Sequence, residues 1–245
     1  MSGHSKWSTI KHKKAATDAK RAKVFTKLIK EMSVAAKLGG GDPEGNPRLR
    51  SAVAAARTAN MPSDNIKRAI QRGTGELPGV TYEEVQYEGY GAGGVAIIVE
   101  TMTDNRMRTT PEIRHLFTKY GGNLGEPNSV AWMFTKKGRF VVAQSGSTEE
   151  QLMEVALEAG ADDLERVGDV FEITTSQESF QSVQQALEAA SITAVDAAIV
   201  METQNNLQLD GKKAEQCLKL LDALDDHDDV QGVHANLEVT DPAMS

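Results

Sequence analysis

Apolar residues in the first quarter of the chain recur every three or four positions, which is the period of an α-helix. Between residues 24 and 36 they form one stripe, and lysines occupy the opposite side of the same helix. Three glycines at 39–41 remove the helical bias, and Pro47 after Asn46 is typical of a helix start. The pattern predicts a bundle of three short helices, followed by a linker at 75–79. These helices cover about residues 17–38, 46–60 and 62–73.

Beyond residue 80 the apolar positions form short alternating runs, which predict strands separated by helices. Thr103 or Asp104 is expected to cap the first of these helices. The segment 136–138 is expected to turn the chain between two strands. The predicted strands are 82–88, 94–103, 130–135, 139–143, 162–165, 169–174, 194–203 and 231–238. The predicted helices are 106–120, 148–159, 177–190 and 212–224.

The order of these elements predicts the domain organisation. From 139 to 203 it is βαββαβ, which is typical of a ferredoxin-like unit. The preceding ββαβ unit lacks one helix and one strand, and the last helix and strand of the chain would complete it. We therefore expect a multidomain α and α+β protein: an N-terminal three-helix bundle followed by two ferredoxin-like α+β domains, the third inserted in the second. The predicted domains are 1–78, 79–136 together with 207–240, and 137–206.

Charge is divided unevenly along the chain. Residues 1–75 hold 16 Lys and Arg against 5 Asp and Glu, a net charge of +11. The remaining 170 residues hold 11 against 30, a net of −19, and the two parts sum to the total of −8. A basic part on an acidic body indicates binding to nucleic acid or another anionic surface. A basic helix that merely faces solvent is the alternative interpretation.

The single cysteine, Cys217, excludes an internal disulfide and fits a reducing compartment, where we expect it to be a small buried residue. The longest apolar run without glycine, 95–99, is too short to cross a membrane. The first 17 residues are basic and superficially suit a transit peptide, but the same pattern continues into the first helix. We expect a cytoplasmic protein.

No known catalytic motif is apparent. The histidines show no metal-ligand spacing, a nucleotide-binding P-loop is absent, and a Gly-x-Ser-x-Gly elbow is absent. The acidic run at 225–229 could suggest a metal site, but it lacks the oxygen spacing of a calcium loop and is better interpreted as a solvated turn. We therefore expect no cofactor and no catalysis. A metal-dependent phosphate enzyme is the alternative from another class.

The basic residues provide the candidate site for nucleic acid. Lysines contact phosphates as point charges, and Trp7 could stack on a base or pack on the bundle. Two arginines at a helix start form a second anion contact, or are simply exposed. Few base-reading side chains accompany the lysines, which favours backbone contact. The predicted contacts are Lys6, Trp7, Lys11, His12, Lys13 and Lys14 in an N-terminal arm, Lys20, Lys23, Lys27 and Lys30 on the first helix, and Arg106 and Arg108.

Several motifs at these positions resemble the YebC/PmpR family. They are GHSKW (3–7), KH (11–12), KAA (14–16), FTKLI (25–29), GGGDP (39–43), NPRLR (46–50), NMP (60–62), YEGYG (87–91), TDNR (103–106), RT (108–109) and GGNLG (121–125). Small departures occur at 126–128 and at 110–111, where proline near a helix start is tolerated.

The resemblance implies a three-domain cytoplasmic protein that binds nucleic acid without catalysis. The family's usual function implies a DNA-binding transcriptional regulator, and its mitochondrial translational activators imply the alternative of a ribosome-associated RNA-binding translation factor. The expected partners are DNA, ribosomal RNA or both, and the ribosome under the second interpretation. No membrane and no small-molecule substrate are expected.

Overall fold

The computed structural model describes the backbone of residues 18–203 and 205–239, and side chains from residue 22 onward. The chain forms two compact units. One unit combines the residues up to Ala131 with those from Asn206 onward, and the other is Trp132–Asn205. The sequence predicts three domains where the structure divides into two units, so the predicted domain limits stay predictions.

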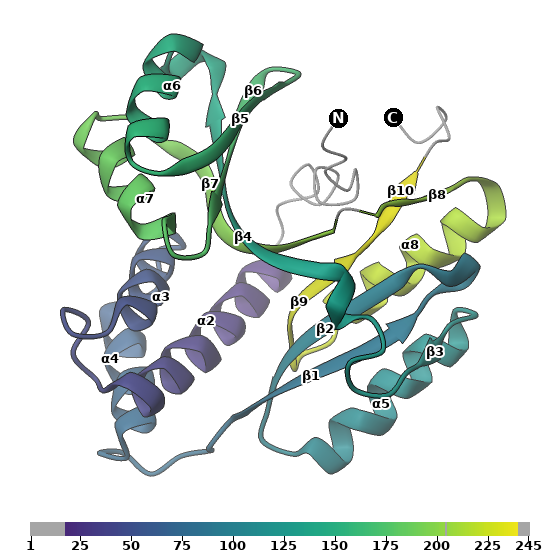
Figure 1. The fold of residues 1–245 in the computed structure, drawn as a ribbon. Helices are drawn as coiled ribbons and strands as arrows, with labels where there is room; N and C mark the ends of the chain where they lie inside the picture. Colours follow the sequence, from purple (N-terminus) through teal and green to yellow (C-terminus); the bar gives the residue numbers. More distant parts are fainter. Residues whose placement is uncertain (1–17, 204, 240–245) are drawn as a thin grey trace. The chain divides into compact units, whose positions relative to one another are not determined.

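The first unit begins with a helical bundle (Figure 1). Its helices are α2 (Asp18–Gly39), α3 (Pro47–Thr58) and α4 (Ser63–Thr74). Asn46 joins two of them, because its Oδ1 accepts a hydrogen bond from the Leu49 N–H at the start of α3 while its Nδ2 donates to the carbonyl of Ala35 in α2. A Cβ on Gly39 would collide with the Asn46 side chain. Glycine therefore ends α2 where this capping residue lies against it.

The rest of the first unit is an antiparallel sheet in the order β3-β1-β2-β9, with two helices packed on one face (Figure 1). The strands are β1 (Glu83–Tyr90), β2 (Ala96–Thr103), β3 (Asn123–Leu124) and β9 (Val230–Ala235), and the helices are α5 (Arg106–Lys119) and α8 (Gly211–Asp225). Strand β9 from the end of the chain thus completes the sheet that β1 and β2 begin, and α8 packs on it. A short parallel pair, β8 (Leu207–Leu209) with β10 (Leu237–Val239), was not expected.

Ile97 of β2, Phe117 of α5 and Leu220 of α8 are fully buried in one core between sheet and helices. Cys217 lies in the same core, which confirms the interpretation of a buried residue. Burial raises the pKa of its thiol to about 12, so the thiolate that reacts with oxidants and electrophiles is disfavoured.

The second unit is an antiparallel sheet in the order β5-β6-β4-β7, covered on one face by two helices (Figure 1). Its elements in chain order are β4 (Phe134–Ala143), α6 (Glu149–Glu158), β5 (Ala161–Val167), β6 (Val170–Ser176), α7 (Phe180–Ala189) and β7 (Ala194–Thr203). This order is the ferredoxin-like βαββαβ connection. The predicted fold class, helices followed by two α+β domains, is confirmed.

Local predictions were wrong at two places. At the first, the predicted strand 130–135 is replaced by a 3-10 helix over Ala131–Met133, and β4 begins only at Phe134. The segment 136–138 is no turn, because β4 runs through it without interruption. Gly138 is needed there because a Cβ would collide with the side chains of Thr175 and Phe180. The second error is the cap of α5, which is Asn105 and not Thr103 or Asp104. The Asn105 side chain accepts from the Arg108 N–H, while Thr103 Oγ1 accepts from the Asn105 N–H.

Candidate nucleic-acid interface

The predicted contacts of the N-terminal arm lie outside the described residues. They are Lys6, Trp7, Lys11, His12, Lys13 and Lys14. Lys20 lies in α2, but its side chain is not among those that the structure describes. The role of these seven residues in nucleic-acid binding stays a prediction.

The other three predicted contacts in α2, all lysines, face acidic residues at the end of α8 and in the turn that follows. Lys23 Nζ lies 3.0 Å from Asp226 Oδ1, and Lys27 Nζ lies 3.2 Å from Asp225 Oδ1. Lys30 Nζ lies 2.7 Å from an oxygen of Asp229. The spacing of these lysines, four and then three residues, places them on one side of the helix. The basic side of α2 is therefore neutralised by the acidic segment 225–229, which we call the acidic turn.

Lys30 and Asp229 are both buried, with 6 % and 3 % of their surfaces exposed. The ammonium group of Lys30 also donates to the carbonyls of Met102 and Asp228, and lies 5.4 Å from the centre of the Tyr82 ring. All three donors of the ammonium group thus have an acceptor. Lys30 connects the helical bundle to the sheet, and the interpretation of the acidic turn as solvated is wrong for Asp229.

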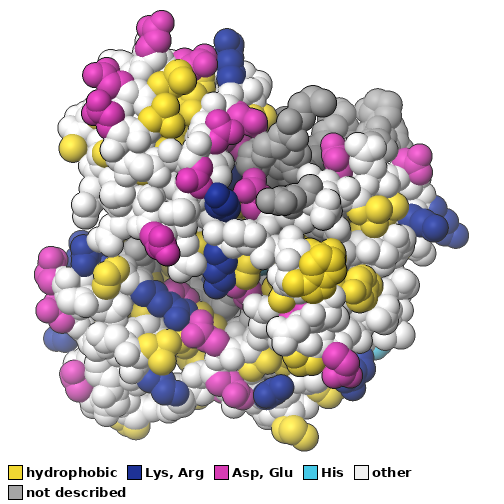
Figure 2. Space-filling view, viewed as in Figure 1, with side chains coloured by type: hydrophobic (Ala, Val, Ile, Leu, Met, Phe, Trp, Pro, Cys, Tyr) yellow, Lys and Arg dark blue, Asp and Glu magenta, His cyan; other side chains and the backbone are white. Residues whose placement is uncertain are grey.

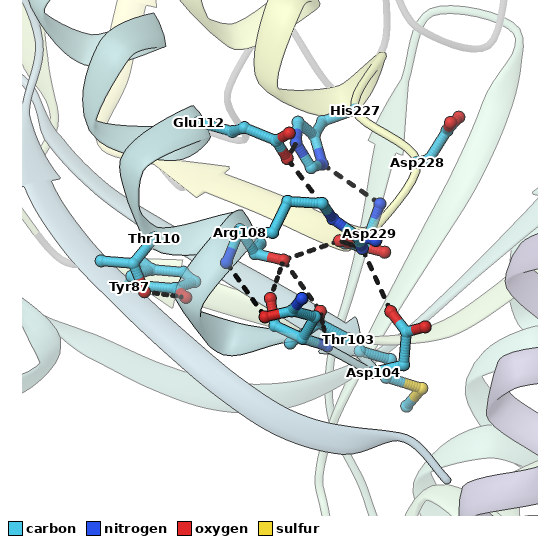
Figure 3. A network of polar contacts seen from close by, with 12 residues as sticks. Tyr87, Thr103, Asp104, Arg108, Thr110, Glu112, His227, Asp228 and Asp229 are labelled. Atoms are coloured by element: carbon cyan, nitrogen blue, oxygen red, sulfur yellow. Dashed lines mark hydrogen bonds and ion pairs between the residues drawn. The ribbon is translucent and has the colours of Figure 1, made fainter. Parts of the chain in front are cut away.

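Asp229 is the centre of a polar network between α5 and the start of β9 (Figure 3). Besides Lys30, it accepts hydrogen bonds from Arg108 at 2.6 Å and from the Thr109 hydroxyl at 2.7 Å. Burial by itself would raise the pKa of Asp229, but the hydrogen bonds from Lys30, Thr109 and Arg108 outweigh it and hold this pKa well below its usual range. Asp229 is therefore an ionised carboxylate whose negative charge is compensated by partners inside the protein.

The two arginines at the start of α5 have different surroundings. Arg108 pairs with Asp229, and its Nη2 also lies 3.1 Å from Asp104 Oδ1. Arg106 is exposed and makes no hydrogen bond or ion pair with the part of the chain that the structure describes. Only Arg106 is therefore uncommitted as an anion contact.

Within the described ranges, Glu112, His227 and Asp229 place possible metal-ligating atoms within 4.8 Å of one another. These atoms already interact. His227 Nε2 lies 3.0 Å from Glu112 Oε2, and His227 Nδ1 accepts from the Asp229 N–H (Figure 3). Arg108 and Lys30 supply positive charge to the same carboxylate of Asp229. The group fits an internal hydrogen-bond network better than a divalent cation, which those two side chains would repel.

The structure reveals three further cations that sequence reasoning missed. Arg57 of α3 and Lys67 and Arg68 of α4 are exposed, and their side chains make no hydrogen bond or ion pair with residues 22–203 or 205–239. They lie on either side of the short connection 59–62. The signal was present in the sequence, because in α4 the charged residues alternate with the buried Ile66 and Ala69 at helical spacing.

The space-filling view shows basic and acidic side chains intermixed over the helical bundle (Figure 2). On the side shown, the basic residues of the described part of the bundle therefore do not form one continuous face. Among described helices, none combines the length and apolar character needed to cross a membrane.

Two family models match this chain. The model described as "TACO1/YebC protein N-terminal domain" matches residues 5–76, and that described as "TACO1/YebC second and third domain" matches residues 82–237. A "Probable transcriptional regulatory protein" of Desulfatibacillum aliphaticivorans is 57% identical over 244 residues, which cover 100% of this chain and 99% of that one. A relative in Geobacter sulfurreducens with the same description is 58% identical over 244 residues, covering 100% of this chain and 98% of the relative.

A solved structure is similar as well. The crystal structure of a conserved hypothetical protein from Aquifex aeolicus superposes with a TM-score of 0.84 at 46% sequence identity. The match covers 93% of this chain and 94% of that one. Both family models, the relatives and this structure agree over nearly the whole length. The chain belongs to the TACO1/YebC family.

Proposed function

We propose that the protein is a non-enzymatic, nucleic-acid-binding regulator of gene expression that acts as a DNA-binding transcriptional regulator in the cytoplasm. The observation that supports it most directly is a group of exposed cations beside the α3–α4 connection, Arg57, Lys67 and Arg68, which lie in the same basic quarter of the chain as the arm and have no partner among the described residues. Cations without internal partners are available to phosphates. The name "Probable transcriptional regulatory protein" of the relatives points to the same class of function.

In this proposal the arm and the α3–α4 surface contact the phosphate backbone. The acidic remainder of the chain repels the same polyanion, so it keeps the nucleic acid on the bundle. Arg57 and Arg68 can each present a planar guanidinium group to two phosphate oxygens, and the lysines act as point charges.

An RNA-binding translation factor on the ribosome is the second candidate. The observation that favours it is that α2, the lysine-rich helix, contains no Asn or Gln and only one Arg, since reading DNA sequence requires such side chains in the major groove. Phosphate contacts by lysines suit structured RNA equally well.

The first test replaces cations and measures binding to DNA over a range of salt concentrations. The variants are a triple change to Ala at Lys11, Lys13 and Lys14, and another at Arg57, Lys67 and Arg68. Each should weaken binding to a short DNA duplex, and each lost phosphate contact should flatten the slope of log K against log salt by about 0.9. The matched control changes Arg114, Lys212 and Lys213, exposed cations of the acidic part, to Ala.

Equal losses in the control and in both test variants would contradict the proposed surface. The nature of the nucleic acid is decided separately. Duplex binding that survives competition by bulk DNA supports the transcriptional regulator. The translation factor is supported if the protein co-sediments with ribosomes at moderate salt and if bulk competitor DNA abolishes its binding to the duplex.

A further inference from the structure

We propose that the acidic turn is an internal competitor of nucleic acid: it covers Lys23 and Lys27, and a phosphate backbone must displace Asp226 and Asp225 from them to reach α2. This inference rests on the proposed function, and it concerns how that function is regulated. Carboxylate and phosphate oxygens are both anionic acceptors, so one can replace the other on a lysine ammonium group.

The three ion pairs differ in how easily they can open. The side chains of Lys30 and Asp229 are 7% and 4% exposed, and those of Lys27 and Asp225 are 21% and 25% exposed. Lys23 is 27% exposed and Asp226 is 83% exposed. Exposure therefore rises along α2 toward its N-terminus, which is the end nearer the basic arm in the sequence. The more exposed a pair is, the less it contributes to stability and the more readily it exchanges partners, whereas the buried pair stays closed.

The end of α8 explains why the acidic residues need these lysines. Asp225 is the last residue of α8 and Asp226 is its C-cap, and the last turn holds no basic residue. Negative charge at a helix C-terminus is unfavourable, because the helix dipole is negative there and the last carbonyls have no partner. Lys27 Nζ donates to the Asp225 carbonyl at 3.4 Å, and Lys23 Nζ donates to the Asp226 carbonyl. The lysines of α2 thus complete the end of α8.

The buried Lys30–Asp229 pair holds the C-terminal end of the acidic turn in place. Asp229 is held by Lys30, Arg108 and Thr109, and the Glu112–His227 contact holds the middle of the turn. Displacement can therefore stay local to Asp225 and Asp226. While these two remain in place, they repel phosphate from α2. The closed arrangement leaves the arm and the α3–α4 surface for first contact.

The test uses the full chain and two isosteric changes, Asp225→Asn and Asp226→Asn, which leave Lys30–Asp229 intact. Affinity for a short DNA duplex and for a hairpin RNA is measured at several salt concentrations. We expect binding to become about three- to tenfold tighter, with the largest gain at low salt. The matched control, Glu154→Gln with Glu158→Gln, removes the same charge from exposed positions of α6.

Repeating the two Asn changes in a variant that lacks Lys23 and Lys27 shows whether the gain in affinity depends on these lysines. When Lys23 and Lys27 are also changed to Ala, the gain from Asp225→Asn and Asp226→Asn should disappear. A gain that persists there, or an equal gain in the α6 control, would show a general charge effect and overturn the inference. Unchanged affinity of the Asn variant beside normal binding by the intact chain would overturn it too, but not the proposed function. Failure of the intact chain to bind either probe would end both.

Discussion

Lys30 Nζ lies 2.7 Å from Asp229 Oδ1, although 199 residues separate them in the sequence. Removing two charges from water is costly, and a buried ion pair is tolerated only where further hydrogen bonds satisfy both partners. Here Lys30 has two carbonyl acceptors in addition, and Asp229 has Arg108 and Thr109. The pair therefore links the bundle to the sheet with every charge compensated.

Removal of one partner should be far more harmful than loss of an exposed pair. Asp229→Ala leaves Lys30 buried without its carboxylate, and we expect the free energy of unfolding to fall by about 3–5 kcal/mol. Asp226→Ala, the control at the exposed end of the same turn, should cost about 1 kcal/mol or less. Urea unfolding measures both. Similar midpoints for the two variants would show that the buried pair has no special role.

Stability in acid should depend on the same carboxylate. The pKa of Asp229 is lowered in the folded protein, because the hydrogen bonds it accepts outweigh the effect of burial. Its contribution to stability is thus complete above the pKa of an unfolded Asp, about 3.9, and is lost as pH falls through the lower folded value. Asp229→Asn removes this dependence.

Unfolding free energies of the intact chain and the Asn variant should therefore approach each other as pH falls from about 5 to about 2. A constant difference across that range would mean that Asp229 is not the group that titrates.

Much of the fold could be predicted, because helices and strands leave a local period in the sequence. The positions of α2, α3 and β7 follow directly from periodicity and from the Asn46–Pro47 start. The continuity of β4 through 136–138, where a turn was predicted, could not be judged in this way. Glycine usually marks a turn, but Gly138 is required by the close approach of Thr175 and Phe180, which are distant in the sequence.

The candidate site was less predictable, because a charge does not reveal its partner. The lysines of α2 and the acidic turn were both visible as charged clusters, yet their pairing depends on contacts across about 200 residues. Conversely, nothing in the sequence distinguishes Arg57 and Lys67 from other charged residues of short helices. They become candidates for phosphate contact only because they are exposed and have no partner among the described residues.

Glu88 should be the main support of the segment that leads out of the first unit. It is 5% exposed, and its carboxylate accepts from the backbone N–H groups of Asn128, Val130 and Ala131, each at 2.8 Å. Burial would raise the pKa of Glu88, but these three bonds lower it overall. Glu88→Gln replaces one of the two acceptor oxygens by an NH2 group, which is a donor and cannot accept from these backbone N–H groups.

We expect Glu88→Gln to reduce the free energy of unfolding by about 1–3 kcal/mol and to increase amide exchange at 128–131. Glu83→Gln, an exposed change in the same strand, is the control and should change neither. Normal exchange protection at 128–131 in the Glu88 variant would contradict this role.

Gly138 should be required for close packing within the second unit, and its replacement should leave the first unit unaffected. Phe180 stacks on Phe140 with 4.6 Å between ring centres, directly where a Cβ on Gly138 would point. Gly138→Ala should therefore force the ring or the strand to move and cost about 1–3 kcal/mol. Gly146→Ala is the control, since a Cβ there meets no atom within 4 Å. Hydrogen exchange should show lost protection in β4, β6 and α7 while α2–α4 keep theirs, and equal exchange in both variants would show that the site has room for a methyl group.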